Sequence, residues 1–238
     1  MKLSIIIPIR NENEGILKTL RIIKEKINDI DYELIVVNDF SQDNSYELVK
    51  KEILNDDKIV VFNNTKKGLG GAITLGINKS KGEAICIMMA DLSDDIEDLR
   101  KYYELIKEKN VDAVFGSRFI KGSNIYGYPT KKLILNRIFN YLTKILFLSK
   151  YNDFTNAFKI YKKSALLKTF PLVSESFNIF LEIPLKIISR KYKYKIIAIN
   201  WMGRKKGDSK FKIRELGSKY LFTLIYCFIE KNLLNIKK

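Results

Sequence analysis

Residues 82–95 read GEAICIMMADLSDD and combine a strand with a cluster of carboxylates. The apolar run from Ala84 to Ala90 predicts a buried strand, and Asp91, Asp94 and Asp95 follow it. Ligands of open α/β sheets bind at the carboxyl ends of strands, where a carboxylate suits a hard cation such as Mg²⁺ or Mn²⁺. This segment therefore predicts a metal site and a phosphorylated substrate.

The chain around this segment alternates between strand and helix patterns. Apolar runs at residues 4–9, 33–37, 58–62 and 112–115 predict four more strands, whose starts lie roughly 25 to 30 residues apart, as in βαβ units. Between the strands, two apolar helix faces are formed by Ile16, Leu20, Ile23, Ile27 and by Ile96, Leu99, Tyr103, Leu105. The alternation predicts an α/β fold with a mostly parallel, Rossmann-like sheet flanked by helices.

The composition limits the possible chemistry. With 238 residues, 46% of them hydrophobic, the chain fits one α/β domain with a sizeable core. It has no histidine, which excludes Ser-His-Asp and Cys-His nucleophile systems, histidine bases and His-ligated zinc. Acid chemistry must therefore come from Asp and Glu.

Cys86 and Cys227 lie in apolar segments, and we expect both to be core residues without a disulfide.

The formal net charge of +16 favours an anionic partner. Nucleic acid, an anionic membrane surface and a phosphate-rich substrate all fit, as do solvated lysine faces. The sequence contains no RNP-like, helix-turn-helix or zinc-finger pattern, which argues against nucleic acid. We expect no signal peptide and no transmembrane helix, because the apolar run at residues 220–229 is about half of the roughly 20 residues that a spanning helix needs.

Four strand ends together carry a more specific pattern. They are SIIIPIRNE at residues 4–12, VVNDFSQDNS at 36–45, MADLSDD at 89–95 and GSR at 116–118. This ordered series resembles glycosyltransferase family 2, the inverting enzymes with a GT-A fold, and within it the dolichol-phosphate mannose synthases and related polyprenyl-phosphate glycosyltransferases. The resemblance covers roughly residues 2–215 and implies a GT-A fold.

The resemblance also implies which residues bind the nucleotide-sugar donor. Pro8, Arg10 and Glu12 would line the nucleoside pocket. Val37 and Asp39 would hold the base. Donor contacts at the fourth strand would come from Ala90, Asp91 and Ser93, with Asp91 also binding Mg²⁺ or Mn²⁺.

The implied catalytic residues are Asp91, Arg118, Arg204 and Lys210. A guanidinium at position 118 can bind phosphate oxygens bidentately. Arg204 and Lys210 lie in a segment with two glycines and five basic residues, residues 203–212, which resembles a basic loop of the family and could close over phosphate as a lid. Residues 153–159 resemble its acceptor-side motif, and Lys132, Asn136 and Arg118 align loosely with its acceptor-phosphate site.

The sequence departs from the family pattern beside Asp91. Met89 stands where family members commonly have the first Asp of Asp-x-Asp, and Ser93 stands where a Gln is frequent. Mg²⁺ keeps several waters, so Asp91 together with diphosphate oxygens could still hold it. Asp94 or Asp95 could join the ligands or could simply begin the next helix, where the helix dipole stabilises carboxylates.

The implied activity is inverting transfer of a hexose from a nucleotide sugar, of the GDP-mannose or UDP-glucose type, to a polyprenyl (dolichyl-type) phosphate. A phosphate monoester is already ionised near neutral pH, with a second pKa of about 6, so this acceptor needs no general base. The sequence does not identify the sugar.

Two apolar helices suggest where such an enzyme would meet a lipid acceptor. Residues 131–149 form an amphipathic helix within the domain 1–215, and residues 216–238 form a C-terminal apolar helix for a membrane or dimer contact. Ordinary core packing is the simpler alternative. We expect a peripheral protein on the cytoplasmic, inner face of an anionic membrane, with an integral membrane protein as a possible partner.

Two other functions stay open. A family 2 enzyme with a glycan or other non-lipid acceptor would need a carboxylate base, for which Asp153 is the candidate, unless it is a turn carboxylate that orients a loop. A catalytically inactive nucleotide-sugar-binding relative is the other, and Met89 is the reason to consider it.

Overall fold

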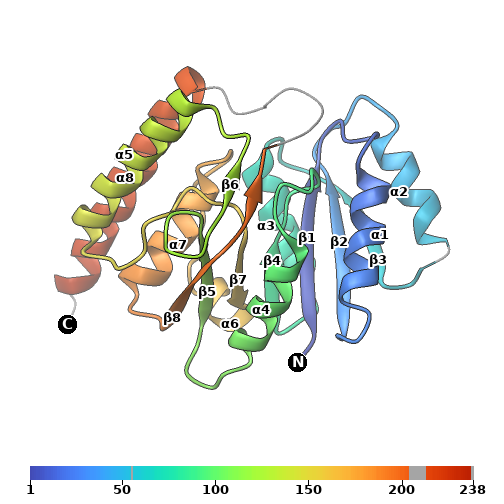
Figure 1. The fold of residues 1–238 in the computed structure, drawn as a ribbon, viewed down its shortest axis with the longest axis horizontal. Helices are drawn as coiled ribbons and strands as arrows, with labels where there is room; N and C mark the ends of the chain where they lie inside the picture. The colour runs from blue at the N-terminus through green and yellow to red at the C-terminus, as the bar shows by residue number, and fades with distance from the viewer. Residues whose placement is uncertain (55, 204–212, 237–238) are drawn as a thin grey trace.

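The protein, described here by a computed structural model, has a central seven-stranded sheet (Figure 1). The structure describes residues 1–54, 56–203 and 213–236. The strands are β1 (Leu3–Ile9), β2 (Tyr32–Asn38), β3 (Ile59–Asn63), β4 (Ala84–Ile87), β5 (Ala113–Ser117), β7 (Lys159–Lys162) and β8 (Tyr194–Ala198), in the order β3-β2-β1-β4-β7-β5-β8. Only β7 among them runs antiparallel to its neighbours, β4 and β5, so the predicted mostly parallel sheet is confirmed.

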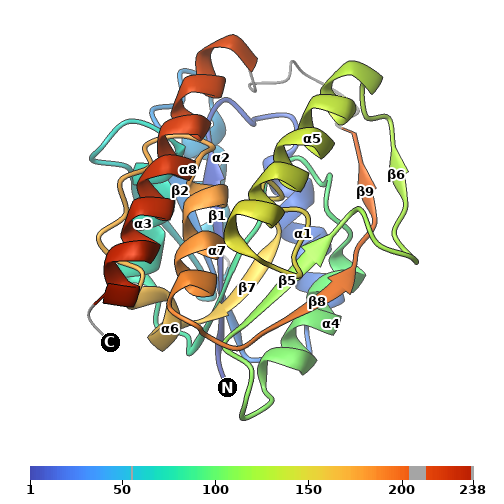
Figure 2. The ribbon, with the colours of Figure 1, turned by 90° about the vertical axis from the view of Figure 1, so that its left-hand side faces the viewer.

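Helices cover both faces of this sheet (Figures 1 and 2). They are α1 (Ile16–Lys26), α2 (Ser45–Ile53), α3 (Leu69–Lys79), α4 (Ile96–Ile106), α5 (Thr130–Phe147), α6 (Lys163–Leu167), α7 (Ile179–Ser189) and α8 (Ile213–Ile236). On one face α1 and α4 pack in a core cluster with Ile5 and Ile7 of β1. On the other face α3, α7 and α8 share a cluster with Ile6. Burial on both faces explains why β1 reads as a continuous apolar run rather than an alternating one.

The fourth strand is shorter than the apolar run predicts. β4 ends at Ile87, although the amide of Met88 still donates to the carbonyl of Ile6 over 3.0 Å. The carbonyl of Ala90 accepts instead from the hydroxyl of Thr19 on α1, at 2.7 Å. The chain therefore leaves the sheet before Asp91, and the predicted strand 84–90 is wrong over its last three residues.

Polar contacts join helix α8 to α7. Lys186 of α7 is buried, forms an ion pair of 2.9 Å with Glu182 of the same helix and lies 3.7 Å from Glu230 of α8, which also bonds Arg190 at the end of α7 at 2.5 Å. Burial of Thr223, Leu224 and Cys227 completes the contact, with Asn178 donating to Thr223 over 2.9 Å. The C-terminal helix thus packs directly on the rest of the fold. Both cysteines are buried and unpaired, as predicted.

A smaller two-stranded sheet lies beside the carboxyl end of the main one. It pairs β6 (Ile125–Tyr126) with β9 (Trp201–Met202) in parallel. The backbone of Asp94 also forms a bridge with Trp201, and the amide of Met202 donates to the carbonyl of Ser93 over 2.9 Å. The segment after β4 is thereby tied to the end of the chain's last strand.

Two helical glycines provide a matched test of packing against β1. A Cβ at Gly76 of α3 would lie 2.5 Å from Cγ2 of Ile6, whereas a Cβ at Gly217 of α8 would meet nothing within 4 Å. Both Gly→Ala changes gain helix propensity, but only Gly76→Ala must overpack the core. We expect Gly76→Ala to unfold with a free energy about 1–3 kcal/mol lower than Gly217→Ala, measured by urea denaturation. Equal values would show that α3 can move away from the sheet at no cost.

Candidate active site

A cavity of about 340 Å³ opens at the carboxyl ends of β4 and β5. Its walls bring together residues from the strand ends, the start of α5, the loop before β7, the start of α7, β9 and α8. Of the residues singled out from sequence, it is lined by Glu12, Met89, Asp91, Ser93, Asp94, Arg118, Lys132 and Asn136. Several of the donor and acceptor residues that the family resemblance implies therefore lie together at one site.

Three strand ends turn sharply by placing a residue in the left-handed region. Asn11 follows β1 with a φ of 53°, Phe40 follows β2 with 56°, and Leu92 follows β4 with 55°. This conformation costs an L-residue about 1–2 kcal/mol and needs support from its surroundings. The loops after β1 and β2 support each other, since Gln42 N donates to Asn11 Oδ1 at 2.8 Å and Glu12 N donates to Ser45 Oγ at 2.7 Å.

The expected base-binding residues lie to one side of this cavity. Asp39 is buried, and its Oδ1 accepts from Asn64 Nδ2 and from the Gly68 amide, both at 2.8 Å. Arg10 is nearby, with Nη1 3.9 Å from Asp39 Oδ2. Val37 is fully buried in a small cluster of apolar side chains, and Pro8 is also buried in β1. The structure thus brings Arg10 and Asp39 together and places the Val37 side chain in the core.

The three carboxylates after β4 have different surroundings. Asp91 accepts from the amide of Ser93 at 3.1 Å and from its hydroxyl. Asp95 caps α4 by accepting from the amide of Glu97 at 3.0 Å. Asp94 is buried at the cavity wall, where burial and the charge of Asp91 raise the pKa of its carboxyl to about 7. Sequence alone did not separate these three roles.

Asp91 and Asp94 are the residues that a divalent cation would meet here. Among the described residues there is no group of three or more His, Cys, Asp and Glu side chains that could hold a metal. Mg²⁺ is commonly bound by one or two carboxylates together with substrate phosphates and water, so two carboxylates at one cavity fit such an ion. After burial, the charge of Asp91 is the next cause of the raised pKa of Asp94, and a cation would relieve this repulsion.

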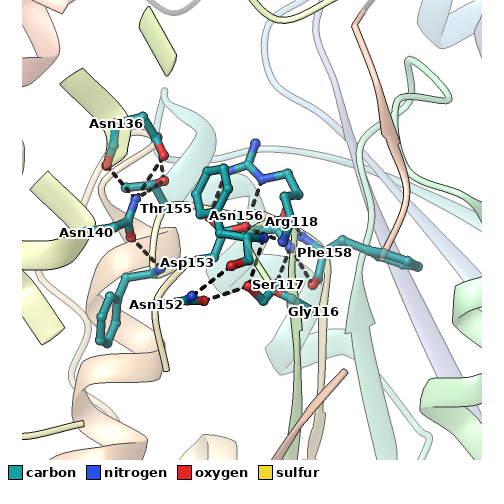
Figure 3. A network of polar contacts seen from close by, with 12 residues as sticks. Gly116, Ser117, Arg118, Asn136, Asn140, Asn152, Asp153, Thr155, Asn156 and Phe158 are labelled. Atoms are coloured by element: carbon teal, nitrogen blue, oxygen red, sulfur yellow. Dashed lines mark hydrogen bonds and ion pairs between the residues drawn. The ribbon is translucent and has the colours of Figure 1, made fainter. Parts of the chain in front are cut away.

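Another part of the cavity wall is built on the buried ion pair of Arg118 and Asp153 (Figure 3). Asp153 accepts from Nε of Arg118 at 2.8 Å, from Nη2 at 2.7 Å and from the backbone amide at 2.9 Å. The guanidinium carbon also lies 5.3 Å from the Phe119 ring centre, 5.6 Å from that of Tyr128 and 5.7 Å from that of Trp201. Burial alone would lower the pKa of Arg118, but the charge of Asp153 raises it above its usual value. Arg118 is therefore a fixed cation.

A polar network extends from this pair toward α5. The Asn156 amide and the Tyr151 hydroxyl both donate to the carbonyl of Gly116, at 3.1 and 2.9 Å. Asn136 of α5 donates to the hydroxyl of Thr155 over 2.7 Å, which links the helix to the loop before β7 (Figure 3). These bonds hold the first half of α5, with Lys132, at the cavity.

Some site residues follow from sequence and others do not. Asp91, Arg118 and Lys132, which the motif series singles out, all line the cavity. Tyr128 and Trp201, which pack on Arg118, were not expected, because β6 and β9 are too short for a periodic pattern. Arg204 and Lys210 lie outside the described residues.

The chain is similar to known proteins in sequence and in fold. The model of the family described as "Glycosyl transferase family 2" matches residues 4–170. A dolichol-phosphate mannosyltransferase of Pyrococcus furiosus is 32% identical over 138 residues, 58% of this chain and 39% of that protein. A polyprenol monophosphomannose synthase of Mycolicibacterium smegmatis is 24% identical over 230 residues, 90% of this chain and 86% of that protein.

A third relative and the solved structures extend this comparison. Glycosyltransferase AglD of Haloferax volcanii is 25% identical over 170 residues, 69% of this chain and 27% of that protein. The chain thus spans less than half the length of the Pyrococcus and Haloferax proteins. Glucosyl-3-phosphoglycerate synthase of Mycobacterium tuberculosis, crystallised with Mn²⁺, UDP and phosphoglyceric acid, has a similar fold, with a TM-score of 0.71 at 15% identity over 95% of this chain and 78% of that one.

The buried pair should be far more sensitive to mutation than a surface pair of the same geometry. Asp153→Asn leaves the Arg118 charge buried with a neutral partner, and we expect it to lower the free energy of unfolding by about 3–5 kcal/mol. Asp29, which binds Arg100 bidentately on the surface at 2.8 and 2.7 Å, provides the control. Asp29→Asn should stay close to the wild type in urea denaturation. Similar small losses for both variants would contradict a structural role for Asp153.

Proposed function

Since the chain belongs to glycosyl transferase family 2, and is a glycosyltransferase, we propose that it transfers a hexose from a nucleotide sugar to a polyprenyl phosphate. One observation carries this proposal. A single cavity is lined by the carboxylates Asp91 and Asp94 and by the cations Arg118 and Lys132. The first pair suits a metal-bound diphosphate and the second suits an anionic acceptor. The names of two relatives, which act on dolichol and polyprenol phosphates, support the acceptor class.

On the donor side, the loops after β1, β2 and β4 form the binding surface. Arg10 and Asp39 would meet the nucleoside, and the already hydrogen-bonded carboxylate of Asp39 is held ready for a base N–H. Asp91 would bind the diphosphate through Mg²⁺ or Mn²⁺, which would neutralise the charge that develops on the leaving group. The Mn²⁺ in a solved structure of the same fold supports a divalent ion without specifying which.

On the acceptor side, Lys132 and Arg118 would hold the phosphate in line with the anomeric carbon. A phosphate oxygen forms the new bond to that carbon as the bond to the diphosphate breaks, with inversion of configuration. The acceptor phosphate is ionised near pH 7, so no proton has to be removed. Asp153, the residue considered as a general base, is fully buried in its pair with Arg118, which favours this acceptor over a sugar hydroxyl.

A non-lipid acceptor remains the second candidate because of Asp94. A carboxyl with a pKa of about 7 at the cavity wall is suited to take a proton from a hydroxyl. An inactive nucleotide-sugar-binding relative is the remaining alternative. Both are separated from the main proposal by direct transfer assays.

The proposal includes peripheral binding to an anionic membrane through α5 and α8. The two helices lie side by side (Figure 2), with ring centres 5.8 Å apart for Phe139 and Tyr220 and 6.1 Å apart for Phe147 and Phe228. Exposed apolar side chains on them are Ile134, Leu135, Ile138, Tyr141, Leu142, Ile145, Leu146, Leu221, Phe222, Ile225, Ile229 and Leu233. None of the described helices has the length and hydropathy to cross a bilayer. Apolar rows on a chain of charge +16 suit the cytoplasmic face of an anionic membrane or an integral membrane partner there.

Transfer of radiolabelled sugar tests the activity. GDP-mannose, UDP-glucose and UDP-GlcNAc are each offered with polyprenyl phosphate and Mg²⁺, Mn²⁺ or EDTA. We expect label in a mild-acid-labile lipid from one donor, lost with EDTA, and reduced by at least about 100-fold in Asp91→Asn because the leaving diphosphate is then less stabilised. Transfer only to soluble sugars would favour the second candidate, and donor binding without any transfer would favour an inactive relative.

Vesicle binding tests the membrane surface. We expect cosedimentation with anionic but not with neutral vesicles, weakened by salt. The double variant Leu142→Glu/Phe222→Glu should bind at least about tenfold more weakly, because each side chain loses about 1.5–3 kcal/mol of burial in lipid. Leu54→Glu, at an exposed position after α2, serves as the control and should bind like the wild type. Unchanged binding of the double variant would contradict this surface, and its conversion from dimer to monomer would identify a dimer contact.

A further inference from the structure

We propose that Asp94 is the second protein carboxylate of the cation site and takes the place that Met89 leaves unfilled. The inference deepens the proposed function, on which it rests. It names a pair, Asp91 and Asp94, as the side chains that hold Mg²⁺ or Mn²⁺ with the donor diphosphate. Four features of the described structure support it.

Burial is the first feature. Six carboxylate residues are buried in the described part of the chain: Glu33, Asp39, Asp94, Asp98, Asp153 and Glu182. Five of them accept at least two hydrogen bonds each from described residues. No hydrogen bond among the described residues ends on the carboxylate of Asp94, which is only 6% exposed and lines the cavity. The Asp94 carboxylate therefore faces the cavity without a donor from the described residues, and an ion bound in the cavity could reach it.

The nearby cations are the second feature. Arg118 and Lys159 lie within electrostatic reach of Asp94. Arg118 is already bound bidentately by Asp153. The Lys159 ammonium donates to the carbonyls of Phe154 and Asn156. Neither basic group donates a hydrogen bond to Asp94, so a cation from solution is a suitable partner for its carboxylate.

The chemistry of Met89 is the third feature. Its side chain lines the same cavity, but a thioether is a soft ligand and binds Mg²⁺ or Mn²⁺ poorly. Asp91 also uses one carboxylate oxygen to accept from Ser93. A second carboxylate ligand would come from another residue at the cavity wall, and of the lining carboxylates Asp94 is the nearest to Asp91 along the chain.

Backbone support is the fourth feature. The left-handed turn at Leu92 reverses the chain, and the bridge between Asp94 and Trp201 fixes the segment to β9. Asp91 and Asp94 thereby face the same cavity while Asp95 points away to cap α4. A carboxylate held by backbone bonds to two elements is preorganised for a ligand.

Trp201 offers a direct reading of metal binding. It is the only tryptophan of the chain and lines the same cavity, so a bound paramagnetic Mn²⁺ should quench its fluorescence. The full chain is titrated with Mn²⁺ in the presence of UDP or GDP, with electron paramagnetic resonance of free Mn²⁺ as an independent count. Asp94→Asn is compared with Asp95→Asn, since Asn caps helices as well as Asp and the control keeps the α4 start intact.

We expect Asp94→Asn to bind Mn²⁺ at least about tenfold more weakly than the wild type and Asp95→Asn to bind it equally well. In EDTA, Asp94→Asn should melt at the same temperature as the wild type or higher, because it removes a buried charge that repels Asp91. Added Mn²⁺ with nucleotide should then raise the melting temperature of the wild type more than that of Asp94→Asn.

Three results would overturn the proposal. They are wild-type Mn²⁺ affinity in Asp94→Asn, no Mn²⁺ binding by the wild type with either nucleotide, and a lower melting temperature of Asp94→Asn in EDTA. If Asp94→Asn keeps Mn²⁺ affinity but loses transfer, Asp94 acts on the acceptor instead. If the wild type binds Mn²⁺ through Asp94 but transfers no sugar to polyprenyl phosphate, the acceptor proposal fails and the Asp94 assignment stands.

Discussion

The part of the cavity around Arg118 depends on the buried ion pair between Arg118 and Asp153. Taking either charge out of water alone costs several kcal/mol, so the pair persists only with its full set of hydrogen bonds and ring contacts. Those contacts come from the end of β5, the loop before β7, the segment that follows β6 and the short strand β9. One electrostatic constraint thus assembles segments more than 80 residues apart, from Arg118 to Trp201, around a single fixed cation.

The antiparallel strand β7 explains how the two halves of the cavity meet. Its first residue, Lys159, pairs with Ile87 of β4 on one side and with Phe115 of β5 on the other. Because β7 runs opposite to both neighbours, its start lies at the edge where they end. The loop before it therefore lies between the carboxylates that follow β4 and the guanidinium that follows β5. A donor diphosphate and an anionic acceptor would be brought together at this edge.

The site also shows why the net charge of the chain was compatible with several kinds of partner. A net charge of +16 fits nucleic acid, membranes or phosphate. The structure places part of that charge at the cavity, which is lined by Lys132 and by Arg118, the latter paired with Asp153. The sequence already indicated that α5 and α8 are apolar helices. Their position side by side could not be predicted from it, because it results from packing against α7 and from ring contacts between the two helices.

By itself, the sequence determined the fold class and the strand-end residues, because hydrophobic period and strand spacing are local properties. The α/β alternation, four strand positions to within two residues and the carboxylate after β4 are all legible in it. Only the tertiary structure decided which role each of these aspartates has. Asp94 faces the cavity, Asp95 caps a helix and Asp153 is buried in an ion pair, since these outcomes depend on the turn at Leu92 and on contacts with distant residues.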